Sequence, residues 1–267
     1  MIWFLGDVHG NFDHLPGLVA SAAVRPSAIV FLGDLDCPAP YEQCVAGIEA
    51  QGVSTWFIPG NHDTDSRECA TNQLDSEYAK VRNLHGRVVE INGIRIAGLG
   101  GVFRGEIWYP DRQGTMVCHA NYDDYARQLN AIRPRRIRLA AGAEKDELIH
   151  ENRLRKHLSS IFYDDWVRLG CMRADILVTH EAPDCHRHGF TAINELALSL
   201  GVHTVFHGHH HECPDYDGQT SRLGFNAYGV GFCGILDQDG KMIQPGDFDA
   251  ARQRFFGVDE NQRKDNK

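Results

Sequence analysis

Five short apolar runs of this 267-residue chain each end in a cluster of glycine and polar residues. The first three, IWFL (2–5), AIVFL (28–32) and STWFI (54–58), are apolar along nearly their whole length, and helix-like stretches that begin near Phe12 and Tyr41 separate them. Strands of this kind suit a sheet that is covered on both faces. The alternation of strands and helices therefore predicts an α/β fold with right-handed crossovers.

The middle of the chain continues this pattern after one segment that predicts a β-hairpin. Two β-rich runs within 87–101 flank Asn92-Gly93, which is a strong signal for a β-hairpin. The runs at 174–179 and 203–207 then return to the sheet, with a helix expected to begin at about Phe190.

Two further segments complete the expected domain, which spans residues 1–257. The segment 122–170 has a helical and highly charged pattern, so we expect a helical insertion there. The run 224–237 and the strand after the turn at Asp239-Gly240 indicate a β-meander. Residues 258–267 have no apolar periodicity, and we expect a disordered tail.

The polar clusters at the strand ends are GDVHG, GDLD, GNHD, THEAP and GHHH. In open α/β sheets the loops beyond the carboxyl ends of the strands build the binding site, so these clusters are expected to converge. Carboxylates mixed with imidazoles favour first-row divalent metals. The side chains are too many for one tetrahedral site, and two adjacent metals are the simplest interpretation.

These five motifs, in this order, resemble the calcineurin-like metallophosphoesterase superfamily, whose pattern is GDxHG, GDxx, GNH(D/E), a strand-end His and GHxH. The similarity spans residues 5 to about 211. It implies a four-layer α/β/β/α sandwich that carries the helical insertion. It also implies hydrolysis of a phosphoester by a hydroxide bound to two divalent metal ions, with manganese the first expectation and iron or zinc the alternatives.

The resemblance also assigns roles to individual residues. Three side chains would hold the first metal: Asp7, His9 and His211. Three others would hold the second: Asn61, His180 and His209. Asp34 would bridge both metals, and His62, oriented by Asp63, would act as the acid or electrostatic group near the leaving oxygen. Of the remaining histidines in the GHHH region, His210 is expected to point away and His207 to be packed near the site.

Two departures from the family pattern leave the substrate open. GDLDCPAP lacks the arginine of the GDxVDRG motif, which argues against a simple protein phosphatase. The run 98–110 is similar to a loop of phosphodiesterase-like members, where Arg104 would bind a phosphate; the alternative is an exposed surface arginine.

The helical insertion contains a basic segment. Residues 127–157 include nine Lys or Arg and four Asp or Glu, around RPRRIR (133–138). They form either a solvated helical hairpin or a lid that attracts a polyanion.

The expected function is therefore that of a metal-dependent phosphoester hydrolase. Its phosphorylated substrate would be a small molecule, a phosphoprotein or a nucleic acid, and the oligomeric state is open. A nuclease and a non-catalytic metal-dependent scaffold are the alternatives, although a scaffold would lack His62 or a ligand. The net charge of −9 argues against a general nucleic-acid coat protein. No apolar run approaches the ~20 residues of a membrane helix, and without a basic leader the start predicts a cytoplasmic protein.

Overall fold

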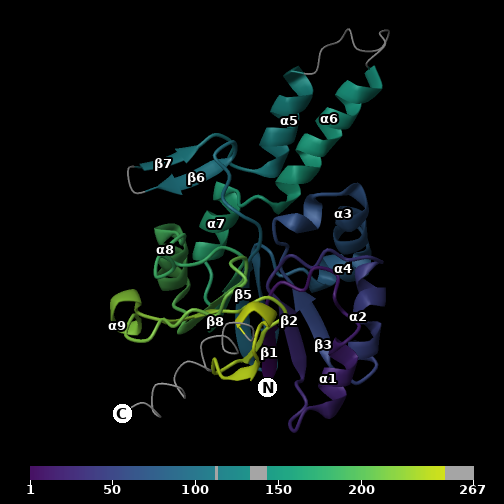
Figure 1. Ribbon diagram of the computed structural model, residues 1–267. Coiled ribbons are helices and arrows are strands. Elements are labelled where there is room, and N and C mark those ends of the chain that lie inside the picture. Colours follow the sequence, from purple (N-terminus) through teal and green to yellow (C-terminus); the bar gives the residue numbers. More distant parts are fainter. Residues whose placement is uncertain (112–113, 133–142, 250–267) are drawn as a thin grey trace, which may run out of the picture.

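The computed structural model describes residues 1–111, 114–132 and 143–249 of the chain. Two five-stranded sheets pack face to face in its centre, and helices cover their outer faces (Figure 1). The first sheet has the order β12-β11-β1-β2-β3. Its strands are β1 (Ile2–Leu5), β2 (Ala28–Phe31), β3 (Ser54–Phe57), β11 (Ile235–Asp237) and β12 (Met242–Gln244).

The parallel part of the first sheet confirms the strands expected at 2–5, 28–32 and 54–58. Strands β1, β2 and β3 run parallel, whereas β11 and β12 add antiparallel pairs at the other edge. Every residue of β1 and β2 is buried, as their continuous apolar pattern requires.

The second sheet has the order β10-β9-β8-β5-β4. Its strands are β4 (Arg87–Ile91), β5 (Ile94–Leu99), β8 (Ile176–Thr179), β9 (Thr204–His207) and β10 (Asn226–Gly229). The hairpin between β4 and β5 turns at Asn92 and Gly93 as predicted, with φ of 53° and 80°. Both angles are positive, which a two-residue type I′ turn requires.

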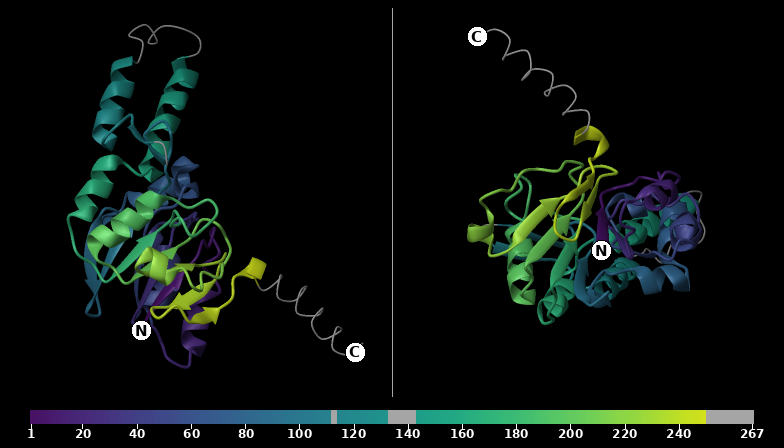
Figure 2. Two further views of the ribbon diagram at one scale, coloured as in Figure 1. Left: turned by 90° about the vertical axis from the view of Figure 1, so that its left-hand side faces the viewer. Right: turned by 90° about the horizontal axis from the view of Figure 1, so that it is seen from below.

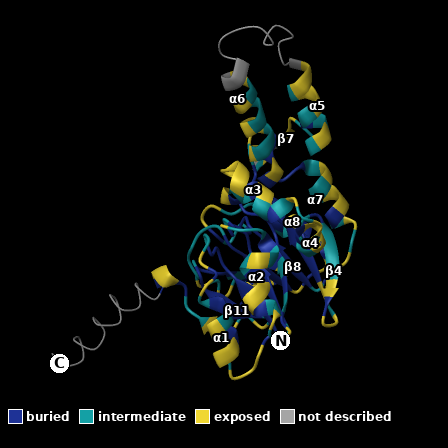
Figure 3. Cartoon of the chain, turned by 90° about the vertical axis from the view of Figure 1, so that its right-hand side faces the viewer, coloured by how far each residue is buried: buried dark blue, intermediate teal, exposed yellow. Residues whose placement is uncertain are grey.

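Three hydrophobic cores define four layers, and the predicted α/β/β/α sandwich is confirmed. Between the sheets, the rings of Phe4 and Phe206 stack at 4.0 Å. Outside the first sheet, α1 (Leu15–Ser21) and α2 (Tyr41–Glu49) bury their apolar faces, and outside the second sheet α8 (Thr191–Leu200) does the same. Figure 3 shows these buried strands between helices whose outer faces are exposed. Each fully buried large side chain stabilises the fold by about 1.5–3 kcal/mol.

The remaining helices lie around this sandwich. Helices α3 (Arg67–Leu74) and α4 (Glu77–Arg82) follow β3 and precede the second sheet. The short α9 (Thr220–Leu223) precedes β10.

The helical insertion divides into a projecting part and a packed part. Helices α5 (Tyr122–Ile132) and α6 (Ala143–Lys156) stand away from the body (Figures 1 and 2). By contrast, α7 (Tyr163–Gly170) packs against α8, where Trp166 Nε1 donates to the carbonyl of Ala192 at 2.9 Å. The basic run 133–138 and the predicted tail 258–267 lie outside the described residues. The hairpin of β6 (Trp108–Asp111) and β7 (Gly114–Val117) was not anticipated.

The predicted β-meander over 224–237 is wrong. Strand β10 pairs in parallel with β9 in the second sheet, whereas β11 pairs antiparallel with β1 in the first. The loop between β10 and β11 therefore crosses from one sheet to the other. Alternation along a strand reports which face is buried but not which strand is the neighbour, so the sequence pattern could not reveal this crossing.

Candidate metal centre

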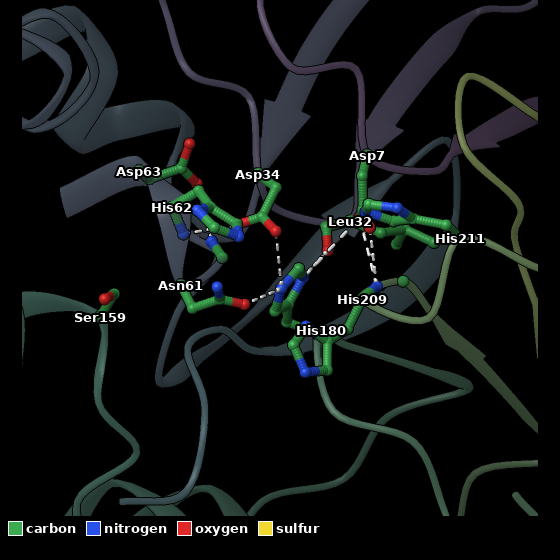
Figure 4. Close-up of polar contacts among 12 residues, drawn as sticks. Asp7, Leu32, Asp34, Asn61, His62, Asp63, Ser159, His180, His209 and His211 are labelled. Atoms are coloured by element: carbon green, nitrogen blue, oxygen red, sulfur yellow. Dashed lines mark hydrogen bonds and ion pairs between the residues drawn. The ribbon is translucent and has the colours of Figure 1, made fainter. Parts of the chain in front are cut away.

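The polar clusters of the sequence meet at the carboxyl ends of strands from both sheets (Figure 4). Asp7 follows β1, Asp34 follows β2 and Asn61 follows β3, all in the first sheet. His180 follows β8, and the pair His209 and His211 follows β9, both in the second sheet. The edge where parallel strands end thus collects side chains from across the sequence.

One group of possible ligands consists of Asp7, His9, Asp34 and His211, whose ligand atoms lie within 4.8 Å of one another. His211 Nε2 is 3.1 Å from Asp7 Oδ2, and it is 3.3 Å from His9 Nε2. Two imidazole nitrogens and two carboxylates facing one another are a donor set for a divalent cation.

A second group consists of Asp34, His180 and His209, also within 4.8 Å of one another. Asn61 joins it, because its Oδ1 lies 3.1 Å from His180 Nε2. Asp34 belongs to both groups. The two groups contain the residues that the family resemblance gave to two metals.

The hydrogen bonds around His180 show that these residues fit a cation. Its Nδ1 donates to the carbonyl of Leu32 at 2.8 Å, so in the neutral ring Nε2 carries a lone pair. That lone pair faces Asn61 Oδ1 and, at 3.3 Å, Asp34 Oδ2. Asp34 Oδ2 is buried and has no hydrogen-bond partner in the part of the chain that the structure describes. A shared cation would satisfy both the lone pair and the carboxylate oxygen.

The charges of the centre are strongly coupled. Burial opposes the charged form of His180, but Asp34 and Asp7 outweigh it and raise the pKa of His180 to about 10, so a cation bound by Nε2 would take the place of a proton there. Burial also opposes ionisation of Asp34, yet His180 and the backbone of His62 hold the pKa of Asp34 well below its usual range. Burial lowers the pKa of His209 to about 3, which keeps this ring in the neutral form that ligates metals.

Backbone strain marks the same loops. Among the described non-glycine residues with positive φ, five belong to the centre or to its loops: His9 (42°), Asp34 (49°), Asp36 (47°), His209 (71°) and His211 (56°). Each left-handed residue costs about 1 kcal/mol or more. The surrounding bonds offset this cost; for example, the amide of His209 donates to Asp7 Oδ2 at 2.9 Å.

The close approach of the strands requires glycine at two of the motif positions. A Cβ on Gly60 would overlap Asp34 Oδ1, and a Cβ on Gly208 would lie 2.6 Å from Asp7 Oδ1. These glycines therefore leave room for the ligand carboxylates.

Asp36 is a residue of the centre whose role the sequence analysis did not predict. Its Oδ2 lies 2.6 Å from His9 Nδ1. This bond fixes the ring so that Nε2 faces the ligand group, and together with Asp34 it raises the pKa of His9 against the effect of burial. The only signal in the sequence was its position two residues after Asp34.

His62 lies beside the centre, but its orientation differs from the expected one. Its Nδ1 pairs with Asp65 Oδ2 at 2.7 Å, not with Asp63. Asp63 instead accepts from the amides of Gly60 and Asp36, at 2.7 and 2.9 Å. The reason is local geometry: in the 3₁₀-helix η1 (His62–Thr64), residues three apart share a face.

Arg104 lies at the base of the projecting helices rather than on the open surface. Its Nη1 donates to the carbonyl of Ser159 at 2.7 Å and to Ser160 Oγ at 2.9 Å. It also donates to the carbonyl of Lys156. Through these contacts Arg104 stabilises the 3₁₀-helix η3 (His157–Ser159). They give no direct support to phosphate binding by Arg104.

The base of the projecting helices also contacts the segment that contains His62. Arg155 Nε donates to the carbonyl of Thr64, and Arg155 Nη2 donates to the carbonyl of Asp65, both at 3.1 Å. Thr64 Oγ1 and Ser159 Oγ are 2.7 Å apart. The base of the insertion thus supports the loop of His62, a link that no local motif signals.

The two remaining histidines of the GHHH region lie outside both ligand groups. His207 is buried, and its Nε2 contacts the hydroxyl of Tyr216 at 3.0 Å. The ring of His210 stacks on that of His186 at 3.8 Å. Both placements agree with the packed and outward positions expected for them.

Comparison with known proteins identifies the family. The calcineurin-like phosphoesterase family matches residues 1–213, and the chain belongs to this family; it is a hydrolase acting on phosphoric esters. An uncharacterized protein of Haemophilus influenzae (strain ATCC 51907 / DSM 11121 / KW20 / Rd) is 37% identical over 243 residues, which are 91% of this chain and 96% of that protein.

A solved structure shares the fold. The crystal structure of TT1561 of Thermus thermophilus matches with a TM-score of 0.51 and 16% identity, over 91% of this chain and 98% of that one. Within the described ranges, no helix combines the length and the apolar character needed to cross a membrane.

Proposed function

We propose that this hydrolase uses two divalent cations to cleave a phosphoester. Seven side chains would hold them: Asp7, His9, Asp34, Asn61, His180, His209 and His211. The observation that carries the proposal is the position of Asp34, which belongs to both ligand groups and has a buried oxygen without a hydrogen bond in the described part of the chain. A carboxylate so placed suits a bridge between two cations.

The protein itself supplies orientation and charge. Two divalent ions, when bound, produce a nucleophile from water at neutral pH and offset charge on the phosphoryl oxygens. Asp36 and the carbonyl of Leu32 fix the rings of His9 and His180. These bonds leave the Nε2 atom of each ring facing the ligand groups, so the centre is preorganised.

His62 is proposed as the group that assists the leaving oxygen. Its ring lies 5.5 Å from that of His9, and its side chain is 48% exposed, so an ester can reach it. Asp65 Oδ2 lies 2.7 Å from Nδ1 of this ring and orients it. A protonated His62 would donate its proton as the phosphorus–oxygen bond breaks. Asp63 supports the loop by accepting from two amides rather than by holding His62.

We favour a small phosphorylated substrate over a nucleic acid. The nuclease alternative rests on the basic insertion, but Arg155 there donates to the backbone carbonyls of Thr64 and Asp65. A non-catalytic scaffold is disfavoured because His62 and all seven ligands are present. Manganese, and a cytoplasmic location, stay predictions from the sequence; a phosphate contact by Arg104 is not part of the proposal.

The test compares turnover of 4-nitrophenyl phosphate and bis(4-nitrophenyl) phosphate with added manganese, together with metal content. Asp34→Asn should lower both turnover and bound metal, with activity reduced about 100-fold or more. Asp175→Asn is the matched control, because Asp175 precedes β8 at its opposite end and pairs with Arg95. Full metal content and activity in Asp34→Asn, or activity that survives a chelator, would refute the proposal.

A further inference from the structure

Two phenylalanines lie against the histidines of the first ligand group. The ring of Phe232 stacks near that of His9, with centroids 5.5 Å apart and planes at 21°. The ring of Phe248 is nearly parallel to that of His211, at 6.1 Å and 17°. The two phenyl centroids are 5.4 Å apart. We call Phe232 and Phe248 the phenylalanine ledge.

Backbone bonds fix the ledge to the metal-binding loop. The amide of Phe232 donates to the carbonyl of His211 at 3.4 Å, and the amide of Asp247 donates to the carbonyl of Phe232 at 2.9 Å. On the other side of Phe248, Asp249 Oδ1 accepts from the amide of Cys213 at 3.3 Å. The ledge therefore lies beside the first ligand group, with Phe232 in the loop that crosses between the sheets and Phe248 after β12.

The two rings differ in exposure. Phe232 is half-buried and contributes apolar surroundings for the imidazoles. Phe248 is 52% exposed, so much of its ring is uncovered beside the proposed cations. An exposed ring adds little to folding through burial, and the bonds of Asp247 and Asp249 hold the backbone on both sides of Phe248. An uncovered and anchored aromatic ring is what a base-stacking platform requires.

We propose that the ledge stacks the base of a nucleotide substrate, an inference that rests on the proposed phosphoesterase function. The Phe248 centroid is 6.1 Å from the centroid of the His211 imidazole, so its exposed ring lies beside the first ligand group without belonging to it. A base stacked on Phe248 would be joined through its ribose to a phosphate at the ligand groups. A neutral phenyl ring accepts any base, because every base has a π-face.

The experiment measures binding of adenosine 5′-monophosphate and of ribose 5-phosphate, which differ by the base alone, to the manganese-loaded protein by calorimetry. The wild-type protein should bind the nucleotide about 5- to 150-fold more tightly. Phe248→Ala should remove most of this difference and leave ribose 5-phosphate binding unchanged, while Phe248→Trp should keep it. Leu198→Ala, which changes an equally exposed apolar residue on α8, is the control and should behave as wild type.

Three outcomes would overturn the inference. These are equal affinity of the wild-type protein for both ligands, equal weakening of both by Phe248→Ala, or an effect of Phe248→Ala on phosphotyrosine as large as on the nucleotide. Turnover of 4-nitrophenyl phosphate tests the proposed function separately. Turnover without base discrimination rejects only the ledge. Base discrimination without turnover of any ester rejects the proposed catalysis, and the ledge is then a nucleotide-binding surface without a substrate role.

Discussion

The link between Arg155 and the loop of His62 gives the sharpest prediction about catalysis. Arg155→Met keeps the length of the side chain but removes its bonds to the carbonyls of Thr64 and Asp65, each 3.1 Å long. Hydrogen bonds from a charged group contribute about 1.5–3 kcal/mol each, but the bond to Asp65 is exposed, so we expect a total loss of about 2 kcal/mol. The loop would then hold Asp65, and with it His62, less firmly.

The loss of about 2 kcal/mol sets a ceiling of about 30-fold on the fall in kcat, because each 1.36 kcal/mol is a factor of ten. The fall should be greatest for esters with poor leaving groups, which need a proton from His62. It should nearly vanish for 4-nitrophenyl phosphate, whose leaving group needs none. Metal content should stay unchanged, since Arg155 contacts no ligand of either group.

The assay is kcat for a series of substituted phenyl phosphates of rising leaving-group pKa, with metal analysis of each variant. Arg153→Met is the matched control, because it removes the same charge from an exposed position on α6. The reasoning is refuted if Arg155→Met and Arg153→Met give the same dependence on the leaving group. A uniform loss across the series would also refute it, because that would point to damage at the metals rather than at His62.

Other predictions test separate contacts. Asp65→Asn should lower kcat for poor leaving groups about tenfold or more, whereas Asp63→Asn should mainly lower the melting temperature, as activity and thermal denaturation would show. Gly60→Ala should displace the Asp34 carboxylate and reduce bound metal, while Gly17→Ala, with open space around it, should stabilise α1 by about 0.5–1 kcal/mol; metal analysis and denaturation measure both. Burial lowers the pKa of His157 to about 4, below its unfolded value of about 6.5. The stability that the neutral His157 contributes is therefore complete above pH 6.5 and is lost as pH falls towards 4. Between these two pH values, the free energy of unfolding of the wild-type protein should fall by about 2–3 kcal/mol more than that of His157→Gln, as urea titrations would measure.

The strands and the chemistry at their ends could be predicted from local sequence patterns. The apolar runs that became β1 and β2 bury every residue, as suits a parallel sheet that is covered on both faces. Because the parallel strands of such a sheet end at one edge, the motifs that follow them had to gather there. The types of the ligands, and the order of the motifs, could therefore be predicted without the structure.

The neighbours that orient these groups could be identified only from the three-dimensional structure. The contacts of Asp36 with His9 and of Asp65 with His62 depend on backbone turns of a few residues. These turns adopt left-handed and 3₁₀ conformations that only the surrounding contacts stabilise. The crossing of the chain between β10 and β11, which brings Phe248 to His211, depends on strand order. Strand order is set by contacts between distant segments, and a local pattern of burial carries no record of them.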